Sequence, residues 1–218
     1  MRPADAAGNV FAVAWGAGID YCNTQKLKFA HYFTQQIAQN AQLSNNFVRC
    51  ICPANNGTTW CGTQNDGIVV FSPEHVLLQH VALTASGLPT TSIDFLLFDR
   101  QTLYAATPEG LFGCANWQTP HPHFVAIPFA DGSAHPITHL CYSQNTLFAS
   151  YDKGIASLRN NRLVPLAHIA PDYYTLVFAL GNTLLCSTPT QLCALPMLPA
   201  MYLRWRGEPA SIIATRKN

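Results

Sequence analysis

The side chains best suited to binding a ligand lie in short polar turns and in the segments that link one repeated unit to the next. They combine amides, carboxylates, an ammonium group and aromatic rings. The candidate ligand-binding residues are Trp15, Asn46, Asn65, Asp66, Glu109, Tyr151, Asp152, Lys153 and Tyr174. Amides and carboxylates hydrogen-bond to hydroxyl groups, and exposed aromatic faces pack against sugar rings. The mixture therefore favours an oligosaccharide or a similar small molecule as the ligand.

These candidates are spaced by a phrase that recurs along the chain. Each copy begins with a large residue, passes through small residues to a tight turn, and ends in a new apolar strand. The leading residues are Phe11, Trp60, Tyr104, Phe148 and Leu185, which are 49, 44, 44 and 37 positions apart. Such a period, with strand-like pieces in every unit, is typical of blades arranged around an axis. We predict an all-β fold, a β-propeller of about five four-stranded antiparallel blades.

The turn between the second and third strands of each blade carries a glycine in register. Gly18, Gly67, Gly110 and Gly154 occupy this place, and the fifth unit has Gln191 instead. Glycine adopts a positive φ angle without steric cost, which such a turn requires. In a propeller these turns share one face with the linkers between blades. We therefore expect the candidate ligand-binding residues to gather on that face, with the aromatic rings exposed.

The repeat also predicts the boundaries of the blades and of their strands. The blades are expected at 10–44, 45–86, 87–132, 133–170 and 171–205, between an edge at 1–9 and a tail or closing strand at 206–218. Strands are expected at 47–52, 58–63, 68–71 and 76–83 in the second unit, and at 92–98, 102–106, 111–114 and 124–127 in the third. The first unit has no obvious inner strand. Either residues 210–215 close the ring by supplying it, or the chain is part of a larger propeller.

Composition excludes several classes of partner. Only 11% of the residues are charged, the net charge is +1 and there is no basic run, so binding driven by phosphate neutralisation is not expected. No apolar stretch approaches the roughly 18 residues that cross a bilayer, so we expect no membrane span. The first residues lack the apolar run of a secretion signal, so a complete chain would be cytoplasmic.

The cysteines and histidines predict neither a metal site nor a cofactor. Among the eight cysteines, Cys61 and Cys186 fill one slot of the repeat, where they behave as small buried hydrophobes with free thiols. The four histidines that could be drawn as a metal cluster lack an accompanying acid or a fixed ligand spacing. They are His121, His123, His135 and His139.

The sequence does not indicate an enzyme, although two other readings stay open. Asp94 is the acid placed on an inner strand, and the sequence contains neither a phosphate-binding loop nor a nucleophile elbow. A propeller-type glycoside hydrolase or lyase would need further acids close to Asp94. A protein-interaction scaffold would expose a large apolar patch. We expect a non-catalytic module that binds a ligand.

The second unit resembles the two-component regulator propeller repeat. The resemblance rests on residues 43–51, 56–63 and 66–71, which read LSNNFVRCI, NGTTWCGT and DGIVVF, and the first unit is similar at 14–21 and 24–32. In that family the repeats form the extracytoplasmic sensor region of hybrid histidine kinases of Bacteroides-like bacteria. The resemblance implies a periplasmic sensor module that recognises an oligosaccharide or similar ligand, beside other propeller or signalling domains of a longer protein.

Overall fold

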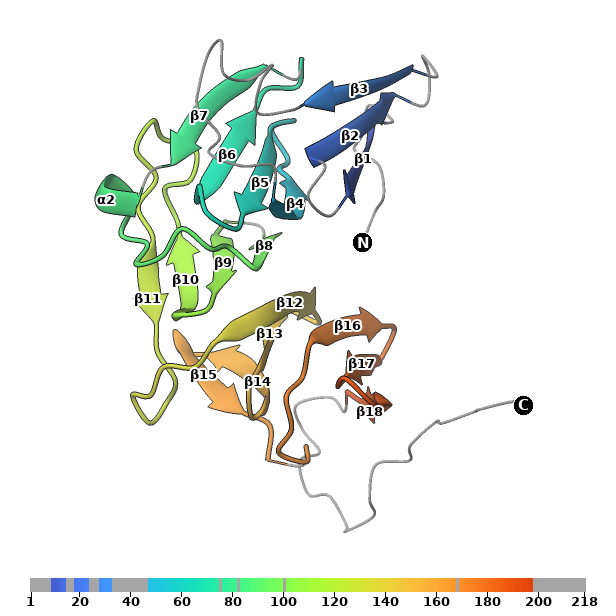
Figure 1. Cartoon of the computed structure of the whole chain (residues 1–218). Helices are drawn as coiled ribbons and strands as arrows, with labels where there is room; N and C mark the ends of the chain where they lie inside the picture. Colours follow the sequence, from blue (N-terminus) through green and yellow to red (C-terminus); the bar gives the residue numbers. More distant parts are fainter. Residues whose placement is uncertain are drawn as a thin grey trace, which may run out of the picture. The chain divides into compact units, whose positions relative to one another are not determined.

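The computed structural model describes residues 9–14, 18–23, 28–32, 47–74, 76–81, 83–99, 101–167 and 169–197, with the backbone alone given for 11–32. The chain divides into two compact units, Met1–Ala126 and Ile127–Asn218. The described residues form antiparallel sheets and one short helix (Figure 1). The predicted all-β fold built of propeller blades is confirmed.

The first unit contains one three-stranded sheet, one whole four-stranded sheet and all but the last residue of another. The first sheet has the order β1 (Asn9–Ala14), β2 (Gly18–Asn23) and β3 (Lys28–Tyr32). The second consists of β4 (Val48–Pro53), β5 (Thr59–Thr63), β6 (Ile68–Phe71) and β7 (Leu77–Val81), and helix α2 (Leu83–Ser86) follows it. The third consists of β8 (Phe95–Phe98), β9 (Leu103–Thr107), β10 (Gly110–Cys114) and β11 (Val125–Ile127).

The second unit repeats this plan. One sheet has the order β12 (Ile137–Ser143), β13 (Thr146–Tyr151), β14 (Gly154–Arg159) and β15 (Arg162–Pro165). The last described sheet consists of β16 (Leu176–Leu180), β17 (Thr183–Ser187) and β18 (Leu192–Pro196). The last residues of the fifth predicted blade, 198–205, and the possible closing strand at 210–215 lie outside the described residues. The exact boundaries between blades remain predictions.

Two strand predictions need correction at their ends. Residue 83 was expected to end a strand, but Leu83 begins α2 and β7 ends at Val81. The strand expected from 92 begins at Phe95, although the Asp94 N–H already donates to the Ala106 carbonyl at 2.8 Å. The sheet ladder therefore extends one hydrogen bond beyond the strand.

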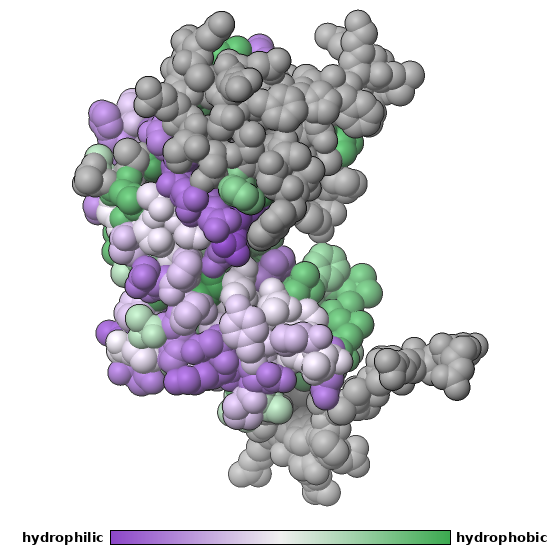
Figure 2. All heavy atoms as spheres, in the orientation of Figure 1, coloured by the Kyte–Doolittle hydropathy of each residue, from purple (hydrophilic) through white to green (hydrophobic). Residues whose placement is uncertain are grey.

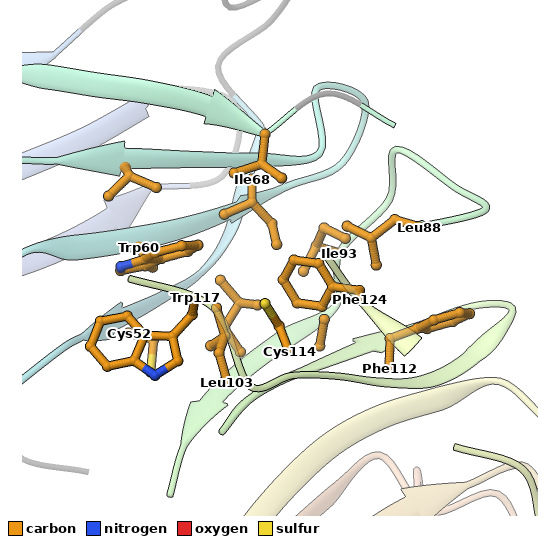
Figure 3. Close-up of a cluster of buried hydrophobic side chains, with 14 of the residues drawn as sticks. Cys52, Trp60, Ile68, Leu88, Ile93, Leu103, Phe112, Cys114, Trp117 and Phe124 are labelled. Atoms are coloured by element: carbon orange, nitrogen blue, oxygen red, sulfur yellow. The ribbon is translucent and has the colours of Figure 1, made fainter. Parts of the chain in front are cut away.

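The second strands of the second and third sheets are buried on both faces. Every residue of β5 and β9 is buried, whereas β17 is buried only at Leu184 and Cys186. Trp60 is 2% exposed, and its ring meets that of Trp117 edge to face with centroids 6.2 Å apart (Figure 3). Both belong to one apolar cluster that joins the second and third sheets. A second cluster joins the two sheets of the second unit.

The turn glycines behave as the repeat predicts at three places. Gly67, Gly110 and Gly154 have φ angles of 70°, 134° and 151°. The fifth turn has Gln191 in place of the glycine, and the Thr188 hydroxyl accepts hydrogen bonds from the backbone N–H groups of Thr190 and Gln191. The turns at Thr63 and Thr107 use a threonine hydroxyl in the same way, so this support does not depend on the glycine.

The prediction of buried free thiols is confirmed for the described cysteines. Six are buried and Cys193 is half-buried, and none of the seven forms a disulfide. Burial raises the pKa of Cys52 and of Cys114 to about 11. These thiols are therefore protonated at neutral pH and act as small apolar groups.

Candidate functional site

In the first unit, the turn between β5 and β6 packs against the linker that enters the third sheet. The Thr63 hydroxyl donates to the Gly67 carbonyl at 3.0 Å and accepts from the Asp66 N–H at 2.8 Å. The Gly67 N–H donates to the Thr91 carbonyl at 2.9 Å, and the Ile93 N–H donates to the Thr63 carbonyl at 2.8 Å. The expected sharing of one face by turns and linkers is found here.

The turn between β9 and β10 is built in the same way. The Thr107 hydroxyl donates to the Gly110 carbonyl at 3.0 Å and accepts from the Glu109 N–H at 3.2 Å. The hydroxyl of a buried threonine thus fixes both turns, which leaves their tips rigid and polar. Asn65 and Glu109 are exposed at these tips, whereas Asp66 is buried, and its backbone carbonyl is hydrogen-bonded to the ring of His80. Asn65 and Glu109 are therefore the candidate side chains that the first unit presents to solvent.

In the second unit, the turn between β13 and β14 presents an acid and a base. Lys153 is exposed, and Asp152 is half-buried. The Asp152 Oδ1 lies 2.9 Å from the His135 Nδ1. The His135 ring also packs against the rings of Phe129 and Tyr151, with centroids 5.0 and 5.4 Å apart. This cluster ties the linker before β12 to the turn and orients the Asp152 carboxylate.

The expectation that Tyr151 and Tyr174 expose their rings is wrong. Both are buried, at 6% and 4% exposure. Tyr151 packs in the aromatic cluster just described, and burial raises its pKa. The Tyr174 hydroxyl donates to the Ala170 carbonyl at 3.2 Å, and burial raises its pKa to about 12. The linker before β16 turns this side chain inward to build the blade.

The same linker exposes its neighbouring aromatic residue. Tyr173 is 43% exposed. Its backbone N–H donates a hydrogen bond to the Asp172 carboxylate at 2.7 Å. The Tyr174 N–H donates to the Tyr151 carbonyl at 3.4 Å, so this linker also adjoins the turn between β13 and β14. Tyr173 is therefore the aromatic side chain that the second unit offers beside Asp152 and Lys153.

The remaining two candidates, Trp15 and Asn46, lie outside the residues whose side chains the structure describes. The other seven divide between the units. Asn65, Asp66 and Glu109 belong to the first, and Tyr151, Asp152, Lys153 and Tyr174 belong to the second. Each unit therefore carries its own group of polar turn residues.

Sequence reasoning did not identify two charged pairs. His135 is 17 positions from its partner Asp152, and no motif links them. Arg49 on β4 places its Nε 3.0 Å from the Asp94 Oδ1, which connects the inner strands of neighbouring sheets. Burial raises the pKa of Asp94, and the Arg49 guanidinium opposes this shift.

Histidine clustering is not found among the described residues. Groups of three or more metal-binding side chains are absent from them. His121 and His123 are exposed in the first unit, while His135 pairs with Asp152 and His139 is half-buried in the second. None of the described helices is long and apolar enough to span a membrane.

Comparison with known proteins relates one repeat to a family and the whole chain to a fold. Residues 42–65 match the family described as the two component regulator propeller. This segment contains β4 and β5 and reaches into the polar turn at Asn65. No curated protein matches the chain.

Several solved propellers superpose on the chain. The extracellular domain of BT3049 from B. thetaiotaomicron, described as a hybrid two component system, aligns with a TM-score of 0.72 at 19% identity, over 96% of this chain and 31% of that one. The corresponding domain of BT4673 gives 0.67 at 16% identity, over 86% and 25%. The Cps50 (Swd1) β-propeller domain of Myceliophteria thermophila gives 0.65 at 11% identity, over 97% and 68%.

These identities establish the fold alone. The chain spans about a third and a quarter of the lengths of the two B. thetaiotaomicron domains. The chain thus has the fold of a β-propeller, and its second blade contains the segment that matches the two component regulator propeller family.

Proposed function

We propose that the chain is a non-catalytic sensor module that recognises an oligosaccharide or a similar ligand as part of a two-component regulatory protein. The family match at residues 42–65 and the extracellular domains among the similar structures support this role. They also support a periplasmic location. The observation that carries the proposal is the repeated construction of the polar turns.

The turns meet the physical requirements of a recognition surface. The Thr63 and Thr107 hydroxyls fix the backbone, so little conformational freedom is lost when a ligand binds. Asn65 and Glu109 in the first unit supply an amide and a carboxylate. Amide and carboxylate oxygens accept hydrogen bonds from hydroxyl groups, and the amide nitrogen donates.

The second unit adds complementary chemistry. Lys153 donates hydrogen bonds, the Asp152 carboxylate accepts them, and Tyr173 offers an exposed aromatic face. The contact with the His135 ring holds the Asp152 carboxylate in one orientation. A sugar presents both hydroxyl groups and an apolar ring face, so this combination fits an oligosaccharide better than a purely ionic or purely apolar ligand.

The partners of the acids support a binding role over a catalytic one. Asp94 is paired with Arg49, and Asp152 is paired with His135. Glycosidases place two carboxyl groups on opposite sides of the scissile bond, and one of them acts as a proton donor. In this chain the Asp94 carboxylate contacts the Arg49 guanidinium and the Asp152 carboxylate contacts the His135 ring, so each of the two already has a basic partner.

A panel of oligosaccharides tests the proposal directly. The intact chain is screened for an increase in melting temperature, because a ligand that binds the folded state stabilises it. Affinity for a stabilising sugar is then measured by calorimetry. We expect Glu109→Ala or Lys153→Ala to weaken binding by about tenfold, the loss of a hydrogen bond to a charged group.

Matched control variants lie at the far ends of β6 and β14, away from the turns that precede these strands. Glu74 is exposed in the turn after β6, and Arg159 is exposed at the end of β14. Glu74→Ala and Arg159→Ala remove the same charges away from the proposed turns, so they should leave affinity unchanged. Equal losses in the controls, or stabilisation by no sugar in the panel, would count against recognition by these turns.

A further inference from the structure

Two cysteines stand opposite each other in the last described sheet. Cys186 on β17 pairs with Cys193 on β18 in the antiparallel register. Directly opposed residues project to the same face of a sheet. This face packs against the preceding sheet, where Cys186 is buried and Cys193 is half-buried. The Cys186 Sγ approaches the Cys193 carbonyl oxygen at 3.7 Å, so the Cys186 side chain is turned toward β18.

This arrangement meets the geometric requirement of a disulfide bond. Directly opposed residues of antiparallel strands have Cα atoms about 4.5 or 5.5 Å apart, depending on the hydrogen-bonding pattern. A disulfide bond accommodates Cα separations of about 4.4–6.8 Å. The backbone pairing of β17 and β18 can therefore stay as it is when the two sulfur atoms bond.

The other blades show that packing at this position does not require two cysteines. The equivalent pairs, one residue after the leading residue of the repeat and opposite it on the next strand, are Cys61–Val69, Ala105–Phe112 and Ala149–Ala156. All of these residues are buried, so the position needs only apolar side chains. Among the cysteines whose side chains are described, Cys186 and Cys193 alone are directly opposed to each other.

The surroundings favour a stable disulfide over ionised thiols. Burial, and then the neighbouring Cys193 side chain, raise the pKa of Cys186 to about 12. Residues 173–197 contain no Lys, Arg or His that could stabilise a thiolate, and Figure 2 shows hydrophobic surface where Figure 1 places β16. Strongly oxidising disulfides depend on a stabilised reduced form. A disulfide in this blade is therefore a structural bond rather than a catalytic one.

We propose that Cys186 and Cys193 form a disulfide bond in an oxidising compartment, and that this bond ties β17 to β18. Both thiols are free in the structure, which is the reduced form. The bond closes the hairpin whose turn contains Thr188 and Gln191. The periplasmic location proposed above supplies an oxidising compartment, but the bond itself does not depend on ligand recognition.

The bond forms by two thiol–disulfide exchanges with a disulfide oxidant such as glutathione disulfide. Cys193 loses its proton, and its thiolate attacks one sulfur of the oxidant, which breaks the oxidant's S–S bond and releases one glutathione thiolate. Cys186 then loses its proton, and its sulfur attacks the Cys193 sulfur, which forms the Sγ–Sγ bond and releases the second glutathione thiolate. The released thiolates take up the two protons. Two protein thiols are thus oxidised, and one oxidant disulfide is reduced to two thiols.

A redox titration of the intact chain in mixtures of oxidised and reduced glutathione tests the proposal. The chain is equilibrated without denaturant and in concentrated urea, and mass spectrometry of alkylated peptides identifies the partner of each cysteine. We expect Cys186–Cys193 to be the main disulfide of the folded chain. Its equilibrium constant should be at least about tenfold larger in the folded chain than in urea, because the hairpin holds the two sulfur atoms together.

Thermal unfolding provides a second measurement. The oxidised chain should melt about 5 °C above the reduced chain, because the bond restricts the unfolded hairpin. Cys193→Ala should abolish this difference, and alanine already occupies the equivalent position of the preceding blade as Ala156. Cys141→Ala is the matched control, because it removes a buried thiol from the same apolar cluster that is opposed to Phe148. It should retain the full difference.

Two results overturn the proposal: an equilibrium constant no larger in the folded chain than in urea, or a different pair as the main disulfide. If Cys193→Ala does not fold, the redox titration of the natural chain still decides, because it needs no variant. A chain that forms this bond but binds no sugar supports the disulfide and refutes the proposed function. A chain that binds a sugar without forming the bond does the reverse.

Discussion

Among the described histidines, His139 is the one whose pKa is most altered by its place in the fold. It lies on the inner strand β12, where burial lowers the pKa of its imidazole to about 4, although a hydrogen bond with the Val177 backbone opposes the shift. The unfolded chain binds a proton near pH 6.5, whereas the folded chain does so only near pH 4. Between these values the unfolded state gains a proton that the folded state lacks.

This difference predicts the pH dependence of folding. The unfolding free energy should fall as the pH drops from about 6.5 to 4, by an amount on the order of 1 to 3 kcal/mol from this residue. Urea titrations of the natural chain and of His139→Gln at several pH values measure the effect. Carboxylates titrate in the same range, so the difference between the two proteins reports His139. Parallel curves would contradict the assignment.

Individual residues of the site were harder to predict than the positions of the turns. Asp66, Glu109 and Asp152 do lie in corresponding turns, because the repeat fixes the backbone. The orientation of the Tyr151 and Tyr174 side chains depends on their contacts with the linkers, and the residue type alone does not predict those contacts. His135 was missed as a partner of Asp152 for the same reason.

At the scale of elements, Gly62 on β5 lies where β4 and the linker before β8 leave no room for a side chain. A Cβ atom there would lie 2.5 Å from the Cys50 Sγ and 2.7 Å from the Ile93 Cγ2. Gly62→Ala therefore overpacks the junction of the second and third sheets. We expect it to lower the unfolding free energy by about 1 to 3 kcal/mol, measured by denaturant titration.

A second substitution tests the physical cause. Cys50→Ala removes the sulfur atom that the new methyl group would meet, so the double variant should recover part of the loss caused by Gly62→Ala. The contact with Ile93 remains, so recovery should be incomplete. Simple additivity of the two single effects would show that the glycine is required for another reason.

The strands were predictable because the leading large residue and the turn glycine recur in nearly every unit. Three of the strands predicted for the second repeat begin and end within one residue of β4, β5 and β6. Helix α2 was not predicted, since Leu83–Ser86 spans four residues and is too short to show a helical period. The fifth turn lacks glycine but keeps the threonine hydroxyl that supports the turns at Thr63 and Thr107, and the repeat pattern did not reveal this shared support.

At the scale of the whole molecule, the chain forms two compact units divided after Ala126, and each unit holds part of the predicted series of blades. Each unit has a cluster of apolar side chains that joins neighbouring sheets. Sequence periodicity predicts the strands of each blade, but it does not indicate where along the chain one compact unit ends and the next begins. The division was therefore beyond the reach of the sequence argument.

The cysteines allow each unit to be followed separately. The first unit buries Cys50, Cys52, Cys61 and Cys114, and the second buries Cys141 and Cys186. The thiolate is the reactive form, and burial raises the pKa of all six thiols, that of Cys186 to about 12. These thiols should therefore resist alkylation by iodoacetamide at pH 8 until the unit that holds them opens.

Mass spectrometry of alkylated peptides over a series of urea concentrations measures this protection. Cys193, which is half-buried, should react first among the described thiols, and Cys193→Ser should remove that fast phase alone. Labelling within each unit should rise together, because the thiols of one apolar cluster become accessible when that cluster opens. The urea concentration at which half of Cys141 and Cys186 is alkylated can differ from the concentration found for the thiols of the first unit. Rapid alkylation of the six buried thiols without urea would contradict the packing of both units.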